Sequence, residues 1–66
     1  MQKVEIRVKG DLDHHWSEWF QDFTISKGEK DETILVGEVV DQAALYGVIG
    51  KLRDLGLTLI AVNEVY

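Results

Sequence analysis

The spacing of the hydrophobic residues changes from a period of two to a helical period and back, twice along the chain. This order constrains the fold more than any other feature of the sequence. Residues 3–9 alternate strictly and predict a strand with one charged face, whose apolar side is made of Val4, Ile6 and Val8. After Gly10 five large apolar side chains fall on one helical stripe, Leu12, Trp16, Trp19, Phe20 and Phe23. They predict a short helix over about residues 13–21, with its aromatic side chains in the core.

The second half of the chain repeats this order. Residues 23–26 and 33–40 predict the two strands of a hairpin, joined by a charged loop of about five residues that contains Gly28. A longer helix follows, because apolar residues recur at helical spacing in Leu45, Val48, Ile49, Leu52 and Leu55. We expect Asp41 to cap its first turn and Gly56 to end it in a left-handed conformation. Residues 57–66 predict the last strand.

The order strand, helix, strand, strand, helix, strand predicts an α+β fold. It is typical of a ferredoxin-like βαββαβ sandwich, a four-stranded antiparallel sheet with two helices on one face and the strand order 4-1-3-2. Residues 1–66 are expected to form a single domain. The chain has no cysteine, so disulfides and thiolate metal sites are excluded. A domain of this size often gains stability from a partner.

Two of the predicted strands carry more apolar residues than one buried face can use. In 33–40, Ile34 and Val36 lie on one face, and Leu35 and Val39 lie on the other. In 57–66 the two sets are Leu57, Leu59 and Ala61 against Ile60 and Val62. One set from each strand has to face away from the helices. Such a surface favours a partner or ligand face, and the alternative is that β-branched residues tolerate partial exposure in strands.

Three polar or small residues add candidates for a ligand or interface site. Arg7 lies on the same outer face, where a guanidinium binds carboxylates or other anions; the alternative is an ion pair with an acid on a neighbouring strand. Gly47 and Gly50 each weaken a helix interior, which suits the close approach of a ligand or another backbone. The alternative is tight packing inside the monomer. A small ligand near Asp41, Gly47 and Arg7 is the corresponding hypothesis.

His14 and His15 are the other residues with potential chemistry. Neighbouring helix positions do not face each other, so the two imidazoles are poor joint ligands. Pairings with Asp11 or Glu18 at helical spacing would give two ligands, fewer than the four of a structural zinc site. The sequence therefore favours a solvated helix start. The alternatives are a weak metal site or a small enzyme that uses His14 or His15 as acid or base.

Composition excludes several classes of function. The net charge of −5 disfavours binding to nucleic acids, because acidic surfaces repel phosphates. No apolar run approaches the length of a membrane-spanning helix, and the N-terminus lacks the apolar region of a signal peptide. We therefore expect a cytoplasmic protein without membrane contact. No nucleotide-binding or nucleophile motif occurs, so we predict no catalytic residue, no cofactor and no metal.

Three motifs resemble those of a group of short uncharacterised bacterial and archaeal proteins. They are W-x-x-W-F at Trp16 to Phe20, D-Q-A-A-L-x-G at Asp41 to Gly47, and R-D-L-G-L-x-L at Arg53 to Leu59. Residues 39–62 are also similar to an ACT-type regulatory domain, although the pattern lies in the second half of this chain and not after its first strand, and Gln42 and Ala43 stand where that domain usually has Pro-Gly. The first resemblance implies no activity, and the second implies binding of a small ligand.

Together these observations predict a homodimeric interaction or ligand-sensing module. It would associate through strands or through the open face of the sheet, with a protein partner or a small ligand as further options. The candidate residues are Arg7, Ile34, Val36, Asp41, Gly47, Gly50, Ile60 and Val62. A small dimeric enzyme or a weak metal binder is the alternative, and the sequence leans against an enzyme.

Overall fold

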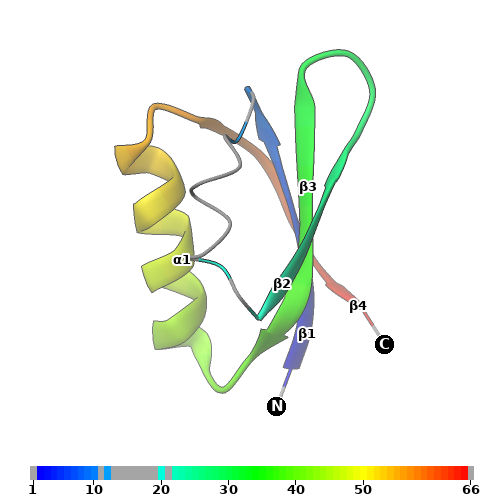
Figure 1. Ribbon diagram of the computed structural model, residues 1–66. Helices are drawn as coiled ribbons and strands as arrows, with labels where there is room; N and C mark the ends of the chain where they lie inside the picture. Colours follow the sequence, from blue (N-terminus) through cyan, green and yellow to red (C-terminus); the bar gives the residue numbers. More distant parts are fainter. Residues whose placement is uncertain (1, 11, 13–19, 21, 66) are drawn as a thin grey trace.

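The structure, a computed structural model, describes residues 2–10, 12, 20 and 22–65. They form four strands and one helix: β1 (Gln2–Lys9), β2 (Phe23–Lys27), β3 (Glu32–Val39), α1 (Gln42–Asp54) and β4 (Thr58–Val65). The strands make one antiparallel sheet, and α1 lies across one of its faces (Figure 1). The α+β class is therefore confirmed. The helix that the sequence predicts over about residues 13–21 lies outside the described residues.

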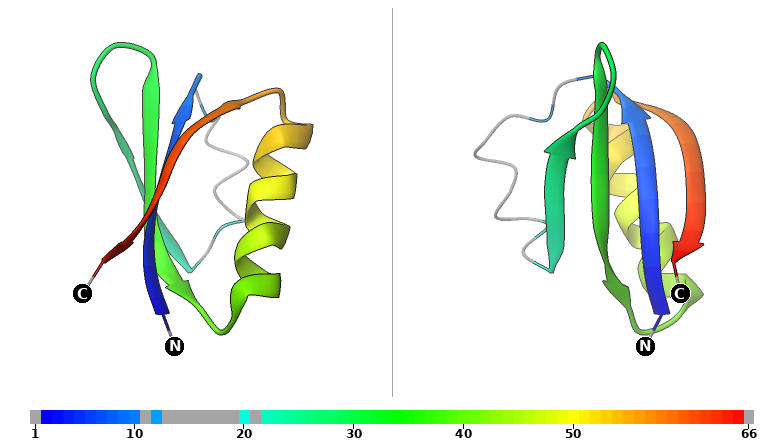
Figure 2. Two further views of the ribbon diagram at one scale, coloured as in Figure 1. Left: turned by 180° about the vertical axis from the view of Figure 1, so that it is seen from behind. Right: turned by 90° about the vertical axis from the view of Figure 1, so that its right-hand side faces the viewer.

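β1 lies inside the sheet and is paired on both sides. The strand order is β2-β3-β1-β4, which is the expected order 4-1-3-2 counted from the other edge. β1 is antiparallel to both β3 and β4, so those two strands run parallel to each other. Their connection therefore has to cross the sheet, and α1 makes that crossover. The right view of Figure 2 shows the sheet from the side opposite α1, with the helix behind the strands.

The core lies between the sheet and α1. The period of two in β1 buries one side of that strand completely, and β3 does the same with its odd-numbered residues. Seven buried apolar residues form the core cluster, Val4, Ile6, Val8, Phe20, Leu35, Val39 and Leu52. Phe20 is therefore a core residue, as expected, and Phe23 packs against the cluster. Trp16 and Trp19, also predicted in the core, lie outside the described residues.

Both ends of α1 follow the sequence signals. At the N-terminus, the Asp41 carboxylate accepts a hydrogen bond from the backbone N–H of Ala44 at 2.8 Å. At the C-terminus, Gly56 adopts a left-handed conformation with φ of 83°. Its N–H donates to the carbonyl of Arg53, and the N–H of Leu57 donates to the carbonyl of Leu52. This pair of bonds is a Schellman motif, which satisfies carbonyls that the helix leaves without partners.

The β2–β3 loop is tied to the end of β1. It comprises residues 28–31, one fewer than expected, and Lys30 takes a left-handed φ of 55°. The N–H of Gly10 donates to the carbonyl of Asp31 at 2.6 Å. The buried hydroxyl of Thr33 donates to the carbonyl of Gly10 at 2.6 Å. These bonds hold the first turn of the chain against the start of β3.

Three glycines differ in what surrounds them. A Cβ on Gly37 would lie 2.5 Å from the carbonyl oxygen of Asp22 and 2.8 Å from the ring of Phe23. The chain that enters β2 therefore crosses closely over β3 at this position. By contrast, a Cβ on Gly47 or Gly50 would have no neighbour within 4 Å among the described residues. The described residues therefore give no support to tight packing of these two glycines inside the monomer, one of the two sequence hypotheses.

Gly37→Ala is expected to destabilise the protein by about 1–3 kcal/mol, because the added methyl collides with a backbone carbonyl that cannot move freely. Gly47→Ala is the matched control. Its methyl meets open space, and the higher helix propensity of alanine should stabilise the protein by up to about 1 kcal/mol. Urea unfolding followed by far-UV circular dichroism measures both changes. Equal effects of the two substitutions would contradict the close approach at Gly37.

Asp41→Ala should lower the free energy of unfolding by about 0.5–2 kcal/mol, because the N–H of Ala44 loses its acceptor. Gln42→Ala, at the next position and equally exposed, should change it by less than about 0.5 kcal/mol. The same urea titration checks both variants. A loss in Gln42→Ala as large as that in Asp41→Ala would argue against a specific cap.

Candidate functional site

The sheet face opposite α1, called the open face below, carries four of the eight predicted candidates. Val4, Ile6 and Val8 are buried under α1. Because successive side chains of a strand point to opposite faces, the charged residues between them lie on the open face. Cross-strand partners share a face, which places Ile34 and Val36 of β3 beside them. Both are half-buried, and Leu35 and Val39 point to the core. The structure thus decides which apolar set of β3 is buried.

Arg7 is held by acids on its own strand and on the next strand. Its Nε donates to Oε1 of Glu5 at 3.1 Å, and its Nη1 lies 3.5 Å from Oε1 of Glu32. The hydrogen bond with Glu5, followed by the attraction of the same carboxylate, raises the pKa of Arg7 above its ordinary value. The predicted ion pair with an acid on a neighbouring strand is therefore present. The charge of the guanidinium is thus partly balanced within the chain, while its side chain stays 41% exposed.

Glu32 completes this small network. Its Oε1 is shielded from solvent and makes no hydrogen bond to any described residue. The 3.5 Å contact with Arg7 is therefore an ionic attraction, longer than an ordinary hydrogen bond. The Glu32 side chain remains 28% exposed, so this carboxylate can still reach water or a partner.

The open face is electrically neutral although the chain is acidic. Its charged residues are three basic and three acidic ones, Lys3, Glu5, Arg7, Lys9, Glu32 and Glu38. The residues that β2 and β4 add in register are uncharged, Thr24, Ser26, Thr58, Ala61, Asn63 and Val65. The whole chain has seven basic and twelve acidic residues. The four basic and nine acidic residues outside this face therefore carry the entire net charge of −5.

A β-bulge in β4 changes which of its residues face outward. Ala61 pairs with Arg7 and Leu59 pairs with Val8, so Ile60 between them has no partner on β1. Leu59 and Ile60 are 46% and 48% exposed. Strict alternation along β4 would put the side chains of Ile60 and Val62 on the same face of the sheet. The extra residue breaks that rule.

The bulge separates the two candidates of β4. Ile60 lines a depression of about 280 Å³ at the end of the open face, together with Lys9, Glu32 and the loop residues 29–31. Val62 pairs with the buried Ile6 and packs against the core. Its assignment to an outer face is therefore wrong. Only Ile60 of this pair belongs to the open face.

The structure does not bring Arg7 together with Asp41 and Gly47. Arg7 lies on the open face, and the other two belong to α1, which covers the opposite face (Figure 1). Asp41 is occupied as the cap of that helix. Gly47 and Gly50 lie on α1, and no residue of the described part of the chain packs where their side chains would be. A small-ligand site formed by Arg7, Asp41 and Gly47 within one chain is therefore excluded.

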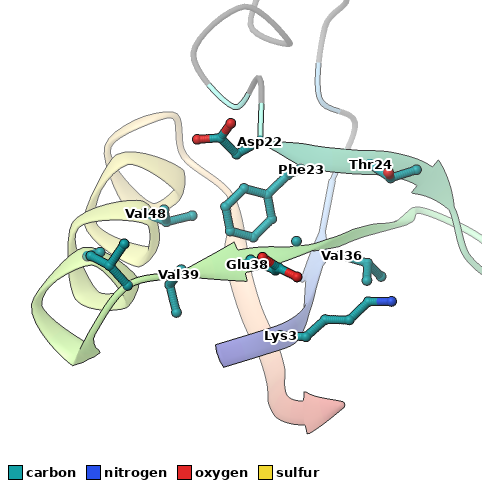
Figure 3. Close-up of a pocket in the computed structure, with 11 residues that line it drawn as sticks. Lys3, Asp22, Phe23, Thr24, Val36, Glu38, Val39 and Val48 are labelled. Carbon is teal, nitrogen blue, oxygen red and sulfur yellow. The ribbon is translucent and has the colours of Figure 1, made fainter. Parts of the chain in front are cut away.

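Sequence reasoning missed a groove at the edge of the sheet. A hollow of about 590 Å³ lies between the start of β2, the end of β3 and the first half of α1 (Figure 3). Phe23, Val39 and Val48 form its apolar walls. The only sequence signal was the length of the strands, since 23–26 is shorter than 33–40 and leaves part of the longer strand without a neighbour.

His14 and His15 lie outside the described residues, so the structure tests neither a metal site nor an acid–base role for them. Among residues 2–10, 12, 20 and 22–65, no group of three or more acidic or histidine side chains is placed to hold a metal. In the same part of the chain, no helix is both long and apolar enough to cross a bilayer.

Comparison with known proteins gives one match. Residues 3–63 match the model of a family described as Domain of unknown function (DUF8691). No curated protein and no solved structure matches the chain.

Because of the bulge, we expect the same substitution to have different effects on stability at Ile60 and at Val62. Val62→Asp should cost about 2–4 kcal/mol of stability, because it places a carboxylate against the apolar core. Ile60→Asp should leave the fold intact, since its side chain already meets water. Far-UV circular dichroism and thermal unfolding check both variants. If Ile60→Asp unfolds the protein and Val62→Asp does not, the register of β4 is wrong.

Proposed function

The chain belongs to the family described as Domain of unknown function (DUF8691), and we propose that it is a small homodimeric interaction module. Two copies associate through their open faces, related by a two-fold axis. In such an interface each subunit contributes the same surface, so the face has to be complementary to itself. The proposal names the second copy of the chain as the occupant of the face.

One observation supports this proposal above the others: the open face is neutral in a chain with a net charge of −5. Two acidic proteins repel each other, and the repulsion is smallest where the facing surfaces carry no net charge. Along β1 the signs alternate as Lys3, Glu5 and Arg7. The next residue of this row, Lys9, is also positive. When two β1 strands lie antiparallel with Glu5 opposite Arg7 of the second copy, these opposite charges attract each other, while Lys3 lies opposite Lys9.

The network at the centre of the face suits burial. Glu5 and Glu32 already neutralise Arg7 within one subunit. A charge that is paired before association loses less on transfer from water than an isolated one. The apolar contribution comes from Ile34, Val36 and the exposed Ile60, which surround the charged centre.

The size of the face sets the expected strength of the dimer. Four strands spaced about 4.8 Å apart, with about 3.3 Å per residue over eight residues, span roughly 500 Å². Two such faces bury about 1,000 Å², at the lower limit of specific interfaces. We therefore expect a dimer that dissociates in the micromolar range, about 1–100 µM.

The strand order also supports a ferredoxin-like architecture for the chain, which we propose together with a cytoplasmic location. The two-helix form of that architecture depends on residues 13–21, and most of these lie outside the described part of the chain. Ligand sensing remains a second use of a dimer of this kind. The enzyme alternative depends on His14 and His15, and no described residue supports it.

Sedimentation equilibrium of the purified chain over a wide concentration range tests the proposal. The wild-type chain should shift from monomer to dimer, and Ile60→Asp should weaken the dimer by about tenfold or more because it adds an acid to the neutral face. Tyr46→Asp is the control, since Tyr46 is also a large exposed apolar residue but lies on α1. It should not change the dissociation constant. A wild-type chain that stays monomeric, or an equal loss in both variants, would overturn the proposal.

A further inference from the structure

The groove at the sheet edge exists because β2 and β3 differ in length. The pairing of these strands ends where Phe23 meets Gly37, and β3 continues through Glu38 and Val39 with β1 as its only partner among the described residues. The preceding Asp22 does not extend the ladder, because its carbonyl lies over the core side of Gly37. β3 therefore presents a short unpaired edge next to an apolar hollow.

The register shows which backbone groups line this edge. The carbonyl of Glu32 accepts a bond from Gly28 and its N–H donates to Glu29, so both backbone groups of Glu32 point toward β2. In a strand every second residue points its backbone groups to the same side. No register shift interrupts β3. The N–H and C=O of Glu38 therefore point into the groove, where no described residue pairs with them.

The walls of the groove are apolar on the side of the helix. Phe23 of β2, Val39 of β3, and Ala44 and Val48 of α1 line it. Val40 is 69% exposed at its end. Figure 3 shows the ring of Phe23 on the side of β2 that faces Val48 and Val39. A side chain that enters the groove would cover apolar surface which the monomer leaves exposed.

The rim of the groove is acidic. Asp22 and Glu38 are both exposed, and they outnumber the one basic lining residue, Lys3. This excess of carboxylates along the rim favours a positively charged ligand. The charge of the rim thus complements a basic ligand.

We propose that this groove binds an extended, basic segment of a partner protein as a short additional strand beside Glu38. The backbone of the segment pairs with the N–H and C=O of Glu38, an apolar side chain enters between Phe23 and Val48, and flanking lysines or arginines meet Asp22 and Glu38. Strand addition of this kind takes affinity from backbone bonds and specificity from side-chain pockets. The inference goes beyond the dimer and does not require it.

The backbone N–H and C=O of Glu38, which no described residue pairs with, favour a peptide over a small amphipathic amine as the ligand. An amine would satisfy the carboxylates and the apolar walls but would leave the N–H of Glu38 without an acceptor. A buried N–H without a partner costs free energy, so a ligand that supplies a carbonyl is preferred. Because only one residue of the edge offers both groups, the binding is expected to be weak.

A fluorescein-labelled peptide, acetyl-Lys-Val-Lys-Val-Lys-amide, is the probe. Fluorescence anisotropy should give a dissociation constant below about 1 mM, and amide chemical shifts should move at Glu38, Val39 and Val40. Glu38→Lys should weaken binding by about tenfold or more, whereas Glu29→Lys, with the same charge change on the β2–β3 loop, should not. The same peptide with a methylated central nitrogen should lose most of its affinity. Sedimentation of each variant in parallel shows whether the dimer is unchanged.

Four results would overturn the proposal. They are no binding up to about 1 mM, equal binding by a Glu-Val-Glu-Val-Glu peptide, equal losses in Glu38→Lys and Glu29→Lys, or full affinity of the methylated peptide. The last result combined with the same shifts from hexylammonium would assign the groove to a small amine. Loss of the dimer with intact peptide binding would instead sink the proposed function alone.

Discussion

β1 is paired on both sides, and its period of two is the constraint on which the rest of the structure depends. Val4, Ile6 and Val8 are completely buried under α1. Their alternation fixes where Lys3, Glu5, Arg7 and Lys9 go, because a residue of a strand cannot change face without breaking the register. One sequence pattern therefore makes the centre of the core and the charged centre of the open face at the same time.

The strands on either side of β1 determine the net charge and the apolar surroundings of its row of charged residues. β3 brings Glu32 within reach of Arg7 and adds Ile34 and Val36 at its side. β4 brings uncharged residues and, through its bulge, the exposed Ile60. A row of charges that would be an ordinary solvated face on an isolated hairpin thus becomes a neutral surface with apolar flanks. The neutrality of this surface and its apolar flanks support the proposed self-association.

The two sheet edges play different roles. β4 is a full-length edge with a bulge, a feature that limits pairing with other strands. β2 is short, so no described residue pairs with β3 on this side beyond Gly37, beside the first half of α1. The absence of a side chain at Gly37 lets Asp22 and Phe23 approach closely, and this approach shapes the groove. The exposed Ile60 of the open face and the groove therefore follow from two separate irregularities of one small sheet.

Local signals determined the elements and their ends. The period of two, the cap at Asp41 and the left-handed Gly56 involve residues a few positions apart, so the sequence by itself predicted four strands, α1 and the strand order. The open surroundings of Gly47, the core position of Val62, the ion pair of Arg7 with Glu32 and the groove at Phe23 depend on how distant strands are aligned. A single extra residue at Ile60 shifts that alignment and leaves no local mark in the sequence, so only the tertiary structure could decide which side chains share a face.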